Sequence, residues 1–325
     1  MVAAVRVHKV GGPEVLTFED IEIPAPGEGQ LKLRQHACGV NFIDTYFRSG
    51  LYPSPTGMPF VAGNEGAGEV IEVGPGVKDF KVGDRVAYVV ALGAYAAERL
   101  LPAARAVKMP DNISYEQAAA MMLKGMTAEY LLHRTFKVEK GATILVHAAA
   151  GGMGAILCQW ANHIGATVIG TAGSKEKAEL AKANGAHHTI LYREEDFAEK
   201  VKEITGGKLC DVVYDGIGND TFPKSLDCIR PLGMFVSFGS ASGPVKAFDI
   251  NLLQAKGSLF ATRPTLNTYA AKREDLVAIA DNLFKVVGSG AVKIPASHKY
   301  ALKDAKQSHI DLEGRKTTGS IILVP

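Results

Sequence analysis

Hydrophobic and polar positions alternate through the first 110 or so residues, and this alternation predicts short β-strands separated by turns. The segments VAAVRVHKV, LTFEDIEI and LKLRQHACGV alternate or run apolar, and PAPGEG interrupts them. GEVIEVGPGV and KVGDRVAYVV add two more strands around the turn at Pro75 and Gly76. Strands with this spacing indicate a small, strongly bent sheet or a partly open barrel.

The pattern changes near Ser114, where helices begin to alternate with strands. Ser114 and Gln117 have the spacing of a capping box, and AAAMMLKGMTAEYLL continues with helical periodicity. From Thr143, the apolar segments TILVHA, TVIGTA, HTILY, DVVYDGIG and MFVSFG alternate with helical segments. Such alternation predicts right-handed crossovers and a parallel sheet. A long amphipathic helix through Val287 follows, and we expect the final strand, SIILVP, to return to the N-terminal domain.

Length and pattern together predict an α/β protein with two domains. The chain has 325 residues, and roughly 150 residues per domain is typical. We expect residues 1–122 and 265–325 to form one domain and residues 123–264 to form a second domain inserted into it.

Composition narrows the classes of function. Lys and Arg number 36 and Asp and Glu number 34, so the net charge is +2, and no basic face for nucleic acid is indicated. The uncharged residues 141–174 contain seven glycines, so we expect no membrane-spanning helix there. The N-terminus lacks an apolar signal core, and the cysteines show no C-x-x-C spacing, which favours a reducing, cytoplasmic location. These cysteines are Cys38, Cys158, Cys210 and Cys228.

A glycine-rich turn carries the clearest chemical signal. Residues 149–154, AAGGMG, fit G-x-G-x-x-G with Ala in the first place, between the strand ILVHA and the helix ILCQWA. Gly151 lets backbone approach a pyrophosphate, and Gly154 lets helix and strand pack closely. The helix N-terminus offers free N–H groups to the phosphates. The turn predicts a Rossmann nucleotide-binding domain, although a tight turn in another α/β protein remains the alternative.

The end of the next strand indicates which nucleotide binds. NAD sites usually carry Asp or Glu there to bind the ribose hydroxyl. Here TVIGTA runs into Gly173, Ser174, Lys175, Glu176 and Lys177, with no acid at the strand end. This loop suits a 2′-phosphate and therefore NADPH, while a solvated first helical turn, with Glu176 favoured by the helix dipole, is the alternative.

Three longer segments carry a family resemblance. HAAAGGMG, GVNFIDTYFRSGLY and GNEGAGEVIEVGPGVKDFKVGDRV together resemble the medium-chain dehydrogenase/reductase superfamily. Within it, the chain is similar to the zinc-free NADPH:quinone oxidoreductases of the zeta-crystallin-like branch, from end to end. The resemblance implies a GroES-like, bent β-barrel catalytic domain beside the doubly wound parallel sheet of the Rossmann domain. Zinc members hold their metal with Cys and His where this chain has Asn41 and Asn64, and amides are poor zinc ligands, so we expect no metal.

The resemblance also implies a set of site residues. Asn41, Tyr46 and Tyr52 are implied in catalysis, with Asn41 donating a hydrogen bond and the tyrosines walling the substrate space. An ordinary core role for the tyrosines stays open. Cofactor contacts are implied for Asn41, Phe42, Asp44, Thr45, Thr127, Gly151, Gly152, Met153, Gly154, Gly173, Ser174, Lys177, Tyr192, Gly218, Phe238, Gly239, Ser240, Arg263 and Arg315. His147, in contrast, is expected to be a hydrogen-bonded core residue.

The implied function is transfer of reducing equivalents from NADPH to a quinone in the interdomain cleft. Reduction of an activated double bond in an enone or enal uses the same hydride geometry and is the alternative. A structural or RNA-binding nucleotide protein is the competing hypothesis from another class, and the near-neutral charge argues against RNA binding. We also expect a homodimer through the nucleotide domains, because the segment LFATR around Phe260 looks like an open sheet edge.

Overall fold

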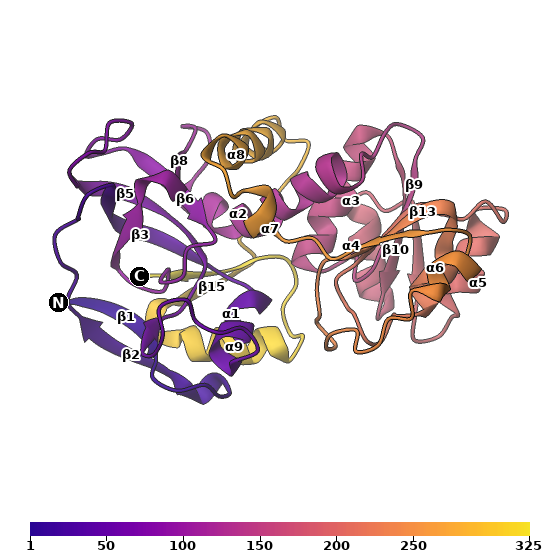
Figure 1. Cartoon of the computed structure of the whole chain (residues 1–325), viewed down its shortest axis with the longest axis horizontal. Helices are drawn as coiled ribbons and strands as arrows, with labels where there is room; N and C mark the ends of the chain where they lie inside the picture. The colour runs from indigo at the N-terminus through magenta and orange to yellow at the C-terminus, as the bar shows by residue number, and fades with distance from the viewer. The chain divides into compact units, whose positions relative to one another are not determined.

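The computed structural model describes all 325 residues, and the chain divides into two compact units (Figure 1). Unit 1 consists of Met1–Met126, Ala270–Gly288 and Ile294–Pro325. Unit 2 consists of Thr127–Tyr269 and Ser289–Lys293. The chain therefore leaves unit 1, builds nearly all of unit 2, and returns to unit 1.

Two sheets form the frame of unit 1. Their strands are β1 (Val2–Val7), β2 (Leu16–Ile21), β3 (Gln30–Val40), β4 (Phe60–Val61), β5 (Glu65–Val73), β6 (Arg85–Val89), β7 (Glu98–Pro102), β8 (Ala106–Lys108), β15 (His298–Ala301) and β16 (Ile321–Val324). One sheet has the order β2-β1-β4, and the other has the order β15-β16-β3-β5-β6-β8 with β7 also paired to β3. The expected return of the last strand is confirmed, because β16 pairs antiparallel with β3.

The long strand β3 shows why the larger sheet bends. Its register against β5 shifts twice, between Lys32 and Leu33 and between Gln35 and Ala37, and such bulges bend a strand. In its first half, alternate residues are buried; from Ala37 onward every residue is buried. The bent, largely antiparallel sheet expected from the sequence pattern is therefore present.

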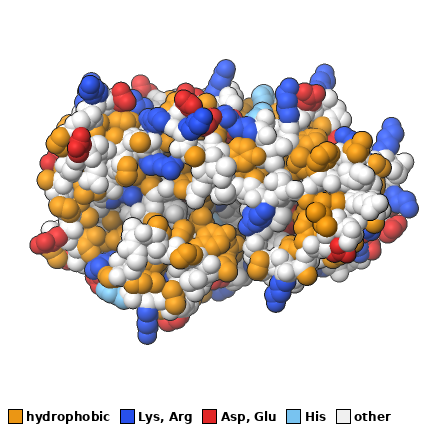
Figure 2. All heavy atoms as spheres, in the orientation of Figure 1, with side chains coloured by type: hydrophobic (Ala, Val, Ile, Leu, Met, Phe, Trp, Pro, Cys, Tyr) orange, Lys and Arg blue, Asp and Glu red, His pale blue; other side chains and the backbone are white.

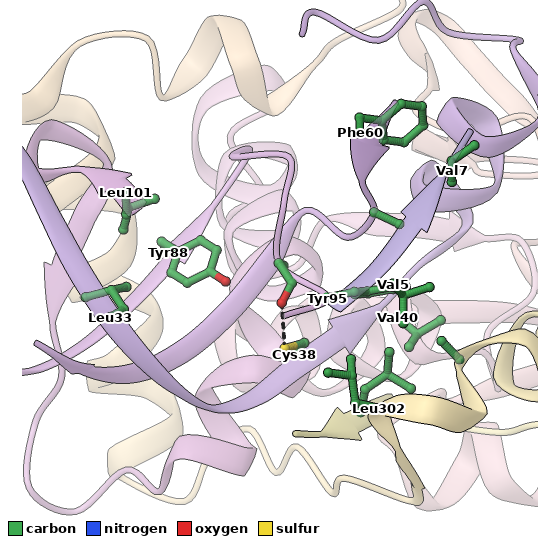
Figure 3. Packing of buried hydrophobic residues seen from close by; sticks show 14 of the residues in the cluster. Val5, Val7, Leu33, Cys38, Val40, Phe60, Tyr88, Tyr95, Leu101 and Leu302 are labelled. Atoms are coloured by element: carbon green, nitrogen blue, oxygen red, sulfur yellow. Dashed lines mark hydrogen bonds between the residues drawn. The ribbon is translucent and has the colours of Figure 1, made fainter. Parts of the chain in front are cut away.

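The core of unit 1 is filled from both sheets and from the C-terminal segment (Figure 3). Val5 and Val7 of β1, Leu33 of β3 and Leu302 are at most 3% exposed. Each aliphatic side chain of this kind stabilises the fold by roughly 1.5–3 kcal/mol on burial. The core thus ties the first and last segments of the chain together.

Unit 1 contains four longer helices, and a capping box in the sequence marks the start of one of them. They are α1 (Phe42–Ser49), α2 (Tyr115–Tyr130, which runs on into unit 2), α8 (Arg273–Gly288) and α9 (Ala305–Glu313). The predicted capping box of α2 is confirmed: Ser114 N donates to Gln117 Oε1 and Gln117 N donates to Ser114 Oγ, both at 3.1 Å. Single helical turns of other types complete the chain, at Pro13–Val15, Ala103–Arg105, Leu131–Thr135, Lys224–Cys228 and Leu302–Asp304.

Unit 2 is a doubly wound parallel sheet with the strand order β11-β10-β9-β12-β13-β14. Its strands are β9 (Thr143–Val146), β10 (Thr167–Ala172), β11 (His188–Leu191), β12 (Cys210–Asp215), β13 (Ile229–Ser237) and β14 (Phe260–Thr262). Its helices are α3 (Gly152–Ile164), α4 (Lys175–Ala183), α5 (Phe197–Ile204), α6 (Asn251–Ala255) and α7 (Leu266–Tyr269). Strand order reverses between β9 and β12, and ligands of such sheets bind beyond the carboxyl ends of the strands at this point.

The structure differs from the sequence pattern at one crossover of this sheet. A full helix was expected between DVVYDGIG and MFVSFG, but the segment forms only the short 3₁₀ turn Lys224–Cys228. Thr221 and Ser225 both donate their hydroxyls to Asp215 Oδ2 at the end of β12, which holds the segment against the sheet. In the whole structure, no helix combines the length and the apolar character that a membrane crossing requires.

Candidate functional site

The glycine turn joins β9 to α3 with very little space between backbone segments. A Cβ atom on Gly154 would lie 2.4 Å from Ala148 O and 2.7 Å from Ala149 Cα. Gly151 precedes α3 in an extended conformation, and its N–H donates to Ala148 O at 2.9 Å. Ala148 itself has a φ of 53°, in the left-handed region. The turn leaves the N–H groups of the first turn of α3 for an anionic ligand.

A buried chain of hydrogen bonds joins the carboxyl ends of β9, β10 and β12. His147 lies between Thr171 Oγ1, at 3.1 Å from Nδ1, and Ser225 Oγ, at 3.0 Å from Nε2. Ser225 donates to Asp215 Oδ2 at 3.1 Å, so its oxygen accepts from His147 Nε2–H. Burial lowers the pKa of His147, so the ring is neutral and Nδ1 accepts from Thr171. The expected satisfied core role of His147 is observed.

This chain positions two loops that follow the strands. Thr171 Oγ1 accepts from Ala148 N at 3.2 Å, at the start of the glycine turn. Asp215 Oδ1 accepts from Ile217 N and Gly218 N. The sequence reasoning did not identify Thr171, Asp215 or Ser225 as positioning residues. The sequence feature that could have identified two of them is their position: Thr171 and Asp215 are polar residues at or next to the end of apolar strands.

The residues predicted to bind a 2′-phosphate follow two neighbouring strands: Gly173, Ser174 and Lys177 follow β10, and Tyr192 follows β11. Ser174 Oγ accepts from Lys177 N at 3.3 Å and caps α4. Tyr192, 42% exposed, lies so close that a Cβ on Gly173 would be 3.1 Å from its hydroxyl. The structure therefore brings Gly173, Ser174, Lys177 and Tyr192 together. Glu176 adjoins them, and its hydrogen bond with Ser174 lowers the pKa of its carboxyl, so the group is ionised at neutral pH.

A second group of predicted residues gathers at the ends of β12, β13 and β14. Phe238, Gly239 and Ser240 directly follow β13, and Gly218, with a φ of 93°, follows β12. Arg263, just after β14, donates to Ser240 Oγ at 3.4 Å. These strand ends form the second half of the same sheet edge as the glycine turn.

In unit 1, two asparagines and two carboxylates form a buried polar cluster. Asn41 Nδ2 donates to Glu65 Oε1 at 2.6 Å, and Asn64 Nδ2 donates to Asp44 Oδ1 at 2.7 Å. Asn41 N also donates to Asp44 Oδ2 at 2.8 Å, closing the capping box of α1. Burial raises the pKa of Asp44 to about 6, against the effect of these donors, and raises the pKa of Glu65.

This cluster does not fit a zinc ion. The amides of Asn41 and Asn64 direct their N–H donors at the two carboxylates, and zinc requires thiolate, imidazole or free carboxylate oxygens. No group of three or more His, Cys, Asp or Glu side chains is arranged to hold a metal ion.

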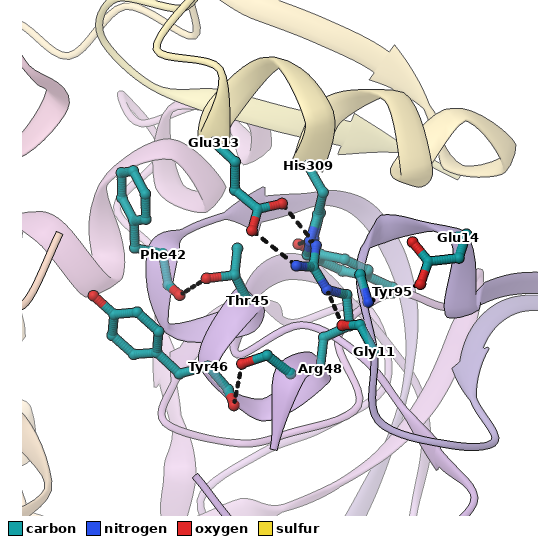
Figure 4. A network of polar contacts seen from close by, with 11 residues as sticks. Gly11, Glu14, Phe42, Thr45, Tyr46, Arg48, Tyr95, His309 and Glu313 are labelled. Atoms are coloured by element: carbon teal, nitrogen blue, oxygen red, sulfur yellow. Dashed lines mark hydrogen bonds and ion pairs between the residues drawn. The ribbon is translucent and has the colours of Figure 1, made fainter. Parts of the chain in front are cut away.

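Asp44 is further connected to the C-terminal helix α9 through the buried side chains of Tyr95 and His309, and Figure 4 shows these two residues near Arg48 and Glu313. Tyr95 donates to Asp44 Oδ2 at 3.0 Å, and His309 Nε2 lies 3.1 Å from the Tyr95 hydroxyl. Arg48, 3% exposed, forms two hydrogen bonds to Glu313 at 2.8 and 2.9 Å and lies 3.1 Å from His309 Nδ1. Both oxygens of Asp44, a predicted cofactor contact, thus accept hydrogen bonds from donors within unit 1.

The other predicted residues of α1 lie on its opposite side. Figure 4 shows Phe42 and Tyr46 on the side of α1 away from Arg48 and Tyr95. Thr45 Oγ1 donates to Phe42 O at 2.7 Å, and the ring of Tyr46 contacts that of Tyr52 edge-on, with centroids 5.3 Å apart.

Three predicted cofactor contacts remain, and one of them, Met153, belongs to the glycine turn. Thr127 is half-buried on α2, Met153 is half-buried in the first turn of α3, and Arg315 is exposed between α9 and β16 with a φ of 56°.

Two family models match the chain and define its class. Residues 27–140 match the alcohol dehydrogenase GroES-like domain, and residues 152–275 match the zinc-binding dehydrogenase domain. A GroES-like domain followed by this dinucleotide domain is the architecture of the medium-chain dehydrogenase/reductase superfamily.

Individual relatives narrow this class. A quinone oxidoreductase of Pseudomonas aeruginosa is 50% identical over 326 residues, covering 100% of both chains. A 2-haloacrylate reductase of a Burkholderia species is 49% identical, covering 100% of this chain and 99% of the relative. The crystal structure of Escherichia coli quinone oxidoreductase complexed with NADPH has a TM-score of 0.96 at 48% identity, covering 99% of this chain and 100% of that one. The chain belongs to the quinone oxidoreductase family, and the resemblance seen in its sequence is confirmed.

Proposed function

We propose that the chain is an NADPH-dependent quinone oxidoreductase that works without zinc. The observation that carries the proposal is the end of β10, which has no carboxylate: Lys177 N donates to Ser174 Oγ there, and the Tyr192 hydroxyl lies beside Gly173. The E. coli relative, crystallised with NADPH and named for quinone reduction, supports the same assignment. Asn41 and Asn64, hydrogen-bonded to carboxylates, support the absence of a catalytic metal.

The residues divide into binding and orienting roles. NADPH, when bound, supplies the hydride. The glycine turn receives the pyrophosphate on the N–H groups of α3, and Lys177 with Ser174 and Tyr192 holds the 2′-phosphate. Gly218, Phe238 to Ser240 and Arg263 line the remaining strand ends, with Thr127 and Arg315 as further contacts. We assign residues 123–264 to NADPH binding and residues 1–122 and 265–325 to catalysis.

Asn41, Tyr46 and Tyr52 are proposed to contact the acceptor. Tyr52 is 37% exposed and packs edge-on against Tyr46, so the pair offers ring faces and ring edges against which a planar aromatic acceptor can pack. Catalysis then rests mainly on orienting donor and acceptor and excluding water.

Reduction of an activated double bond is the second candidate. The Burkholderia 2-haloacrylate reductase, as similar to this chain as the quinone oxidoreductases are, favours it. Both reactions deliver hydride to an electrophilic conjugated acceptor without a Lewis acid.

Parallel assays test the two functions. Oxidation of NADPH is followed by absorbance with 1,4-benzoquinone, with an enone and with 2-chloroacrylate, before and after treatment with a metal chelator. We expect the highest kcat/KM with the quinone and no effect of the chelator. A protein that binds NADPH but oxidises it with none of these acceptors has a structural role, and loss of activity on chelation contradicts the zinc-free assignment.

We also propose a homodimer formed through unit 2. Strand β14 is the edge of the sheet, and Phe260 on it is 57% exposed. Leu232 and Ile250, in nearby segments of the chain, are 63% and 73% exposed. An open edge with exposed apolar side chains is typical of a self-association surface. Analytical sedimentation tests this proposal. We expect the wild type to sediment as a dimer and Phe260→Lys to sediment as a monomer.

The proposed location is the cytoplasm, and no nucleic-acid partner is proposed. All four cysteines are free and buried, as in proteins of reducing compartments. On the face drawn in Figure 2, Lys and Arg are scattered among Asp and Glu rather than gathered into a stripe. Nucleic-acid binding requires such a gathering of positive charge.

A further inference from the structure

Lys124, on helix α2, carries a buried ammonium group with no hydrogen-bond partner. Its Nζ is the one buried side-chain nitrogen or oxygen in the structure that lacks such a partner. An ammonium has three donors and no acceptor, and leaving them unused away from water is costly. Buried polar groups of this kind call for a specific explanation.

Glu65 balances the charge of Lys124 but does not use its donors. The distance from Lys124 Nζ to Glu65 Oε1 is 3.9 Å, beyond hydrogen-bond range. Glu65 Oε1 instead accepts from Asn41 Nδ2 at 2.6 Å, and Oε2 accepts from Leu123 N at 2.5 Å. Burial lowers the pKa of Lys124, and the charges of Glu65 and Asp44 oppose that shift. The carboxylate thus keeps the cation in place and leaves its donors without a partner.

The ammonium lies beside residues already assigned to the reaction. Lys124 Nζ and Asn41 Nδ2 both lie next to the same carboxylate oxygen, Glu65 Oε1, and Asn41 is the proposed acceptor contact. Thr127, a proposed cofactor contact, is three residues further along α2, and residues three apart share one face of a helix.

We propose that the Lys124 ammonium donates a hydrogen bond to the carbonyl oxygen of the acceptor and stabilises the negative charge this oxygen gains on reduction. This inference rests on the proposed function. A quinone that receives hydride becomes the hydroquinone monoanion, and a proton from water completes the hydroquinone, so Lys124 keeps its own proton throughout. A fixed cation in a site with little water stabilises such charge far more than one in solvent.

The test separates a role in acceptor binding from a structural role. Lys124→Met keeps the side-chain length and removes the charge, Lys124→Gln retains a neutral donor, and Lys9→Met, an exposed lysine of unit 1, is the matched control. The first readout is the Kd for NADPH and kcat/KM for 1,4-benzoquinone. We expect Kd to change less than about threefold and kcat/KM to fall at least about thirtyfold in Lys124→Met, with an intermediate fall in Lys124→Gln, since a charge-assisted bond is about twice as strong as a neutral one.

The second readout does not depend on turnover. 4-Nitrophenol, whose ionised form is coloured, mimics the phenolate of the reduced acceptor, and its titration is followed with the NADP⁺ complex of each protein. We expect its pKa to fall by about one unit or more on the wild type and on Lys9→Met, a tenfold preference for the phenolate, and to be unshifted on both Lys124 variants.

Two results would overturn the proposal. If Lys124→Met lowers the melting temperature but leaves kcat/KM and the nitrophenol pKa unchanged, Lys124 serves only as the counter-ion of Glu65. If it weakens NADPH binding alone, the ammonium belongs to the cofactor site. Failure of the wild type to reduce any acceptor would refute the proposed function instead, and the nitrophenol titration still decides the role of Lys124.

Discussion

The hydroxyl of Tyr95 donates to Oδ2 of Asp44 at 3.0 Å, and this bond fixes the direction of a hydrogen-bond chain through unit 1. Because the Tyr95 proton is used, its oxygen accepts from His309 Nε2–H, and His309 Nδ1 then accepts from Arg48. His309 is therefore neutral. Burial, with Arg48 adding to the effect, lowers the pKa of His309 to about 3, in agreement with this assignment.

Replacing Tyr95 with Phe should destabilise the protein clearly. The change leaves one donor, His309 Nε2–H, without its acceptor and removes one of the two donors to Asp44 Oδ2. An unsatisfied buried group costs about 1–3 kcal/mol, and we expect a loss of this size in urea unfolding. Tyr300→Phe is the matched control, because Tyr300 donates to Asp311 at 2.9 Å at the less buried edge of unit 1. Equal losses in the two variants would contradict the buried chain.

The depressed pKa of His309 predicts how stability depends on pH. Above the ordinary value near 6.5, the group is neutral in both folded and unfolded chains, and its contribution is fully present. Below pH 6.5, His309 binds a proton in the unfolded chain, whereas in the folded chain it stays neutral until about pH 3. Stability is thus lost as pH falls, by up to about 1.4 kcal/mol per unit.

His309→Gln isolates this contribution. The variant should be less stable than the wild type at pH 8, because Gln replaces the ring between Arg48 and Tyr95, but it should lose less on acidification. Asp44, whose raised pKa gives the opposite slope, is present in both proteins and cancels in their difference. The difference in unfolding free energy should therefore shrink between pH 6.5 and 4.5. If the difference in unfolding free energy between wild type and His309→Gln stays constant over this pH range, the assignment of a neutral His309 is contradicted. It is also contradicted if the exposed control His163→Gln shows the same change with pH.

Two alanine substitutions in the glycine turn should separate folding from cofactor binding. Gly154→Ala places a Cβ against the backbone of Ala148 and Ala149, so α3 is displaced, with an expected loss of about 1–3 kcal/mol. Gly151→Ala meets only Ala148 O, at 3.2 Å, in a backbone conformation open to alanine. Its stability should be nearly unchanged, yet its Cβ obstructs the pyrophosphate and weakens NADPH binding at least about tenfold. Wild-type affinity in Gly151→Ala would remove the turn from the phosphate site.

Apart from the return of the last strand to the N-terminal domain, the parts of this protein that the sequence predicted are those encoded locally. The capping box of Ser114 and Gln117 spans three residues, and the strand alternation and the glycine turn span a few more. The bond from Arg48 to Glu313 joins positions 265 apart, and the one from Tyr95 to His309 joins positions 214 apart. No pattern along the chain contains such pairs, because they exist only after the sheets of unit 1 have assembled.

Lys124 is a sharper case of the same limit. In the sequence it is the one charged residue of the apolar run AAAMMLKGM. Its lack of a hydrogen-bond partner becomes apparent only once Glu65, 59 positions earlier, is seen to accept from Asn41 and Leu123 instead.

The choice between NADPH and NADH is set by charges at the start of α4. Lys177 is half-buried and its N–H donates to Ser174 Oγ, and a charge-assisted bond from its ammonium to a 2′-phosphate contributes roughly 1.5–3 kcal/mol. NADPH should therefore bind at least about tenfold more tightly than NADH. Glu176, ionised and hydrogen-bonded to Ser174, opposes the phosphate charge. Lys177→Ala should narrow the preference while sparing NADH binding, Glu176→Gln should widen it, and Lys182→Ala, further along the same helix, should change neither affinity. Fluorescence titration of both cofactors into the four proteins measures these shifts; equal affinities in the wild type would refute the phosphate site, because the loop would then contribute nothing to the choice of nucleotide.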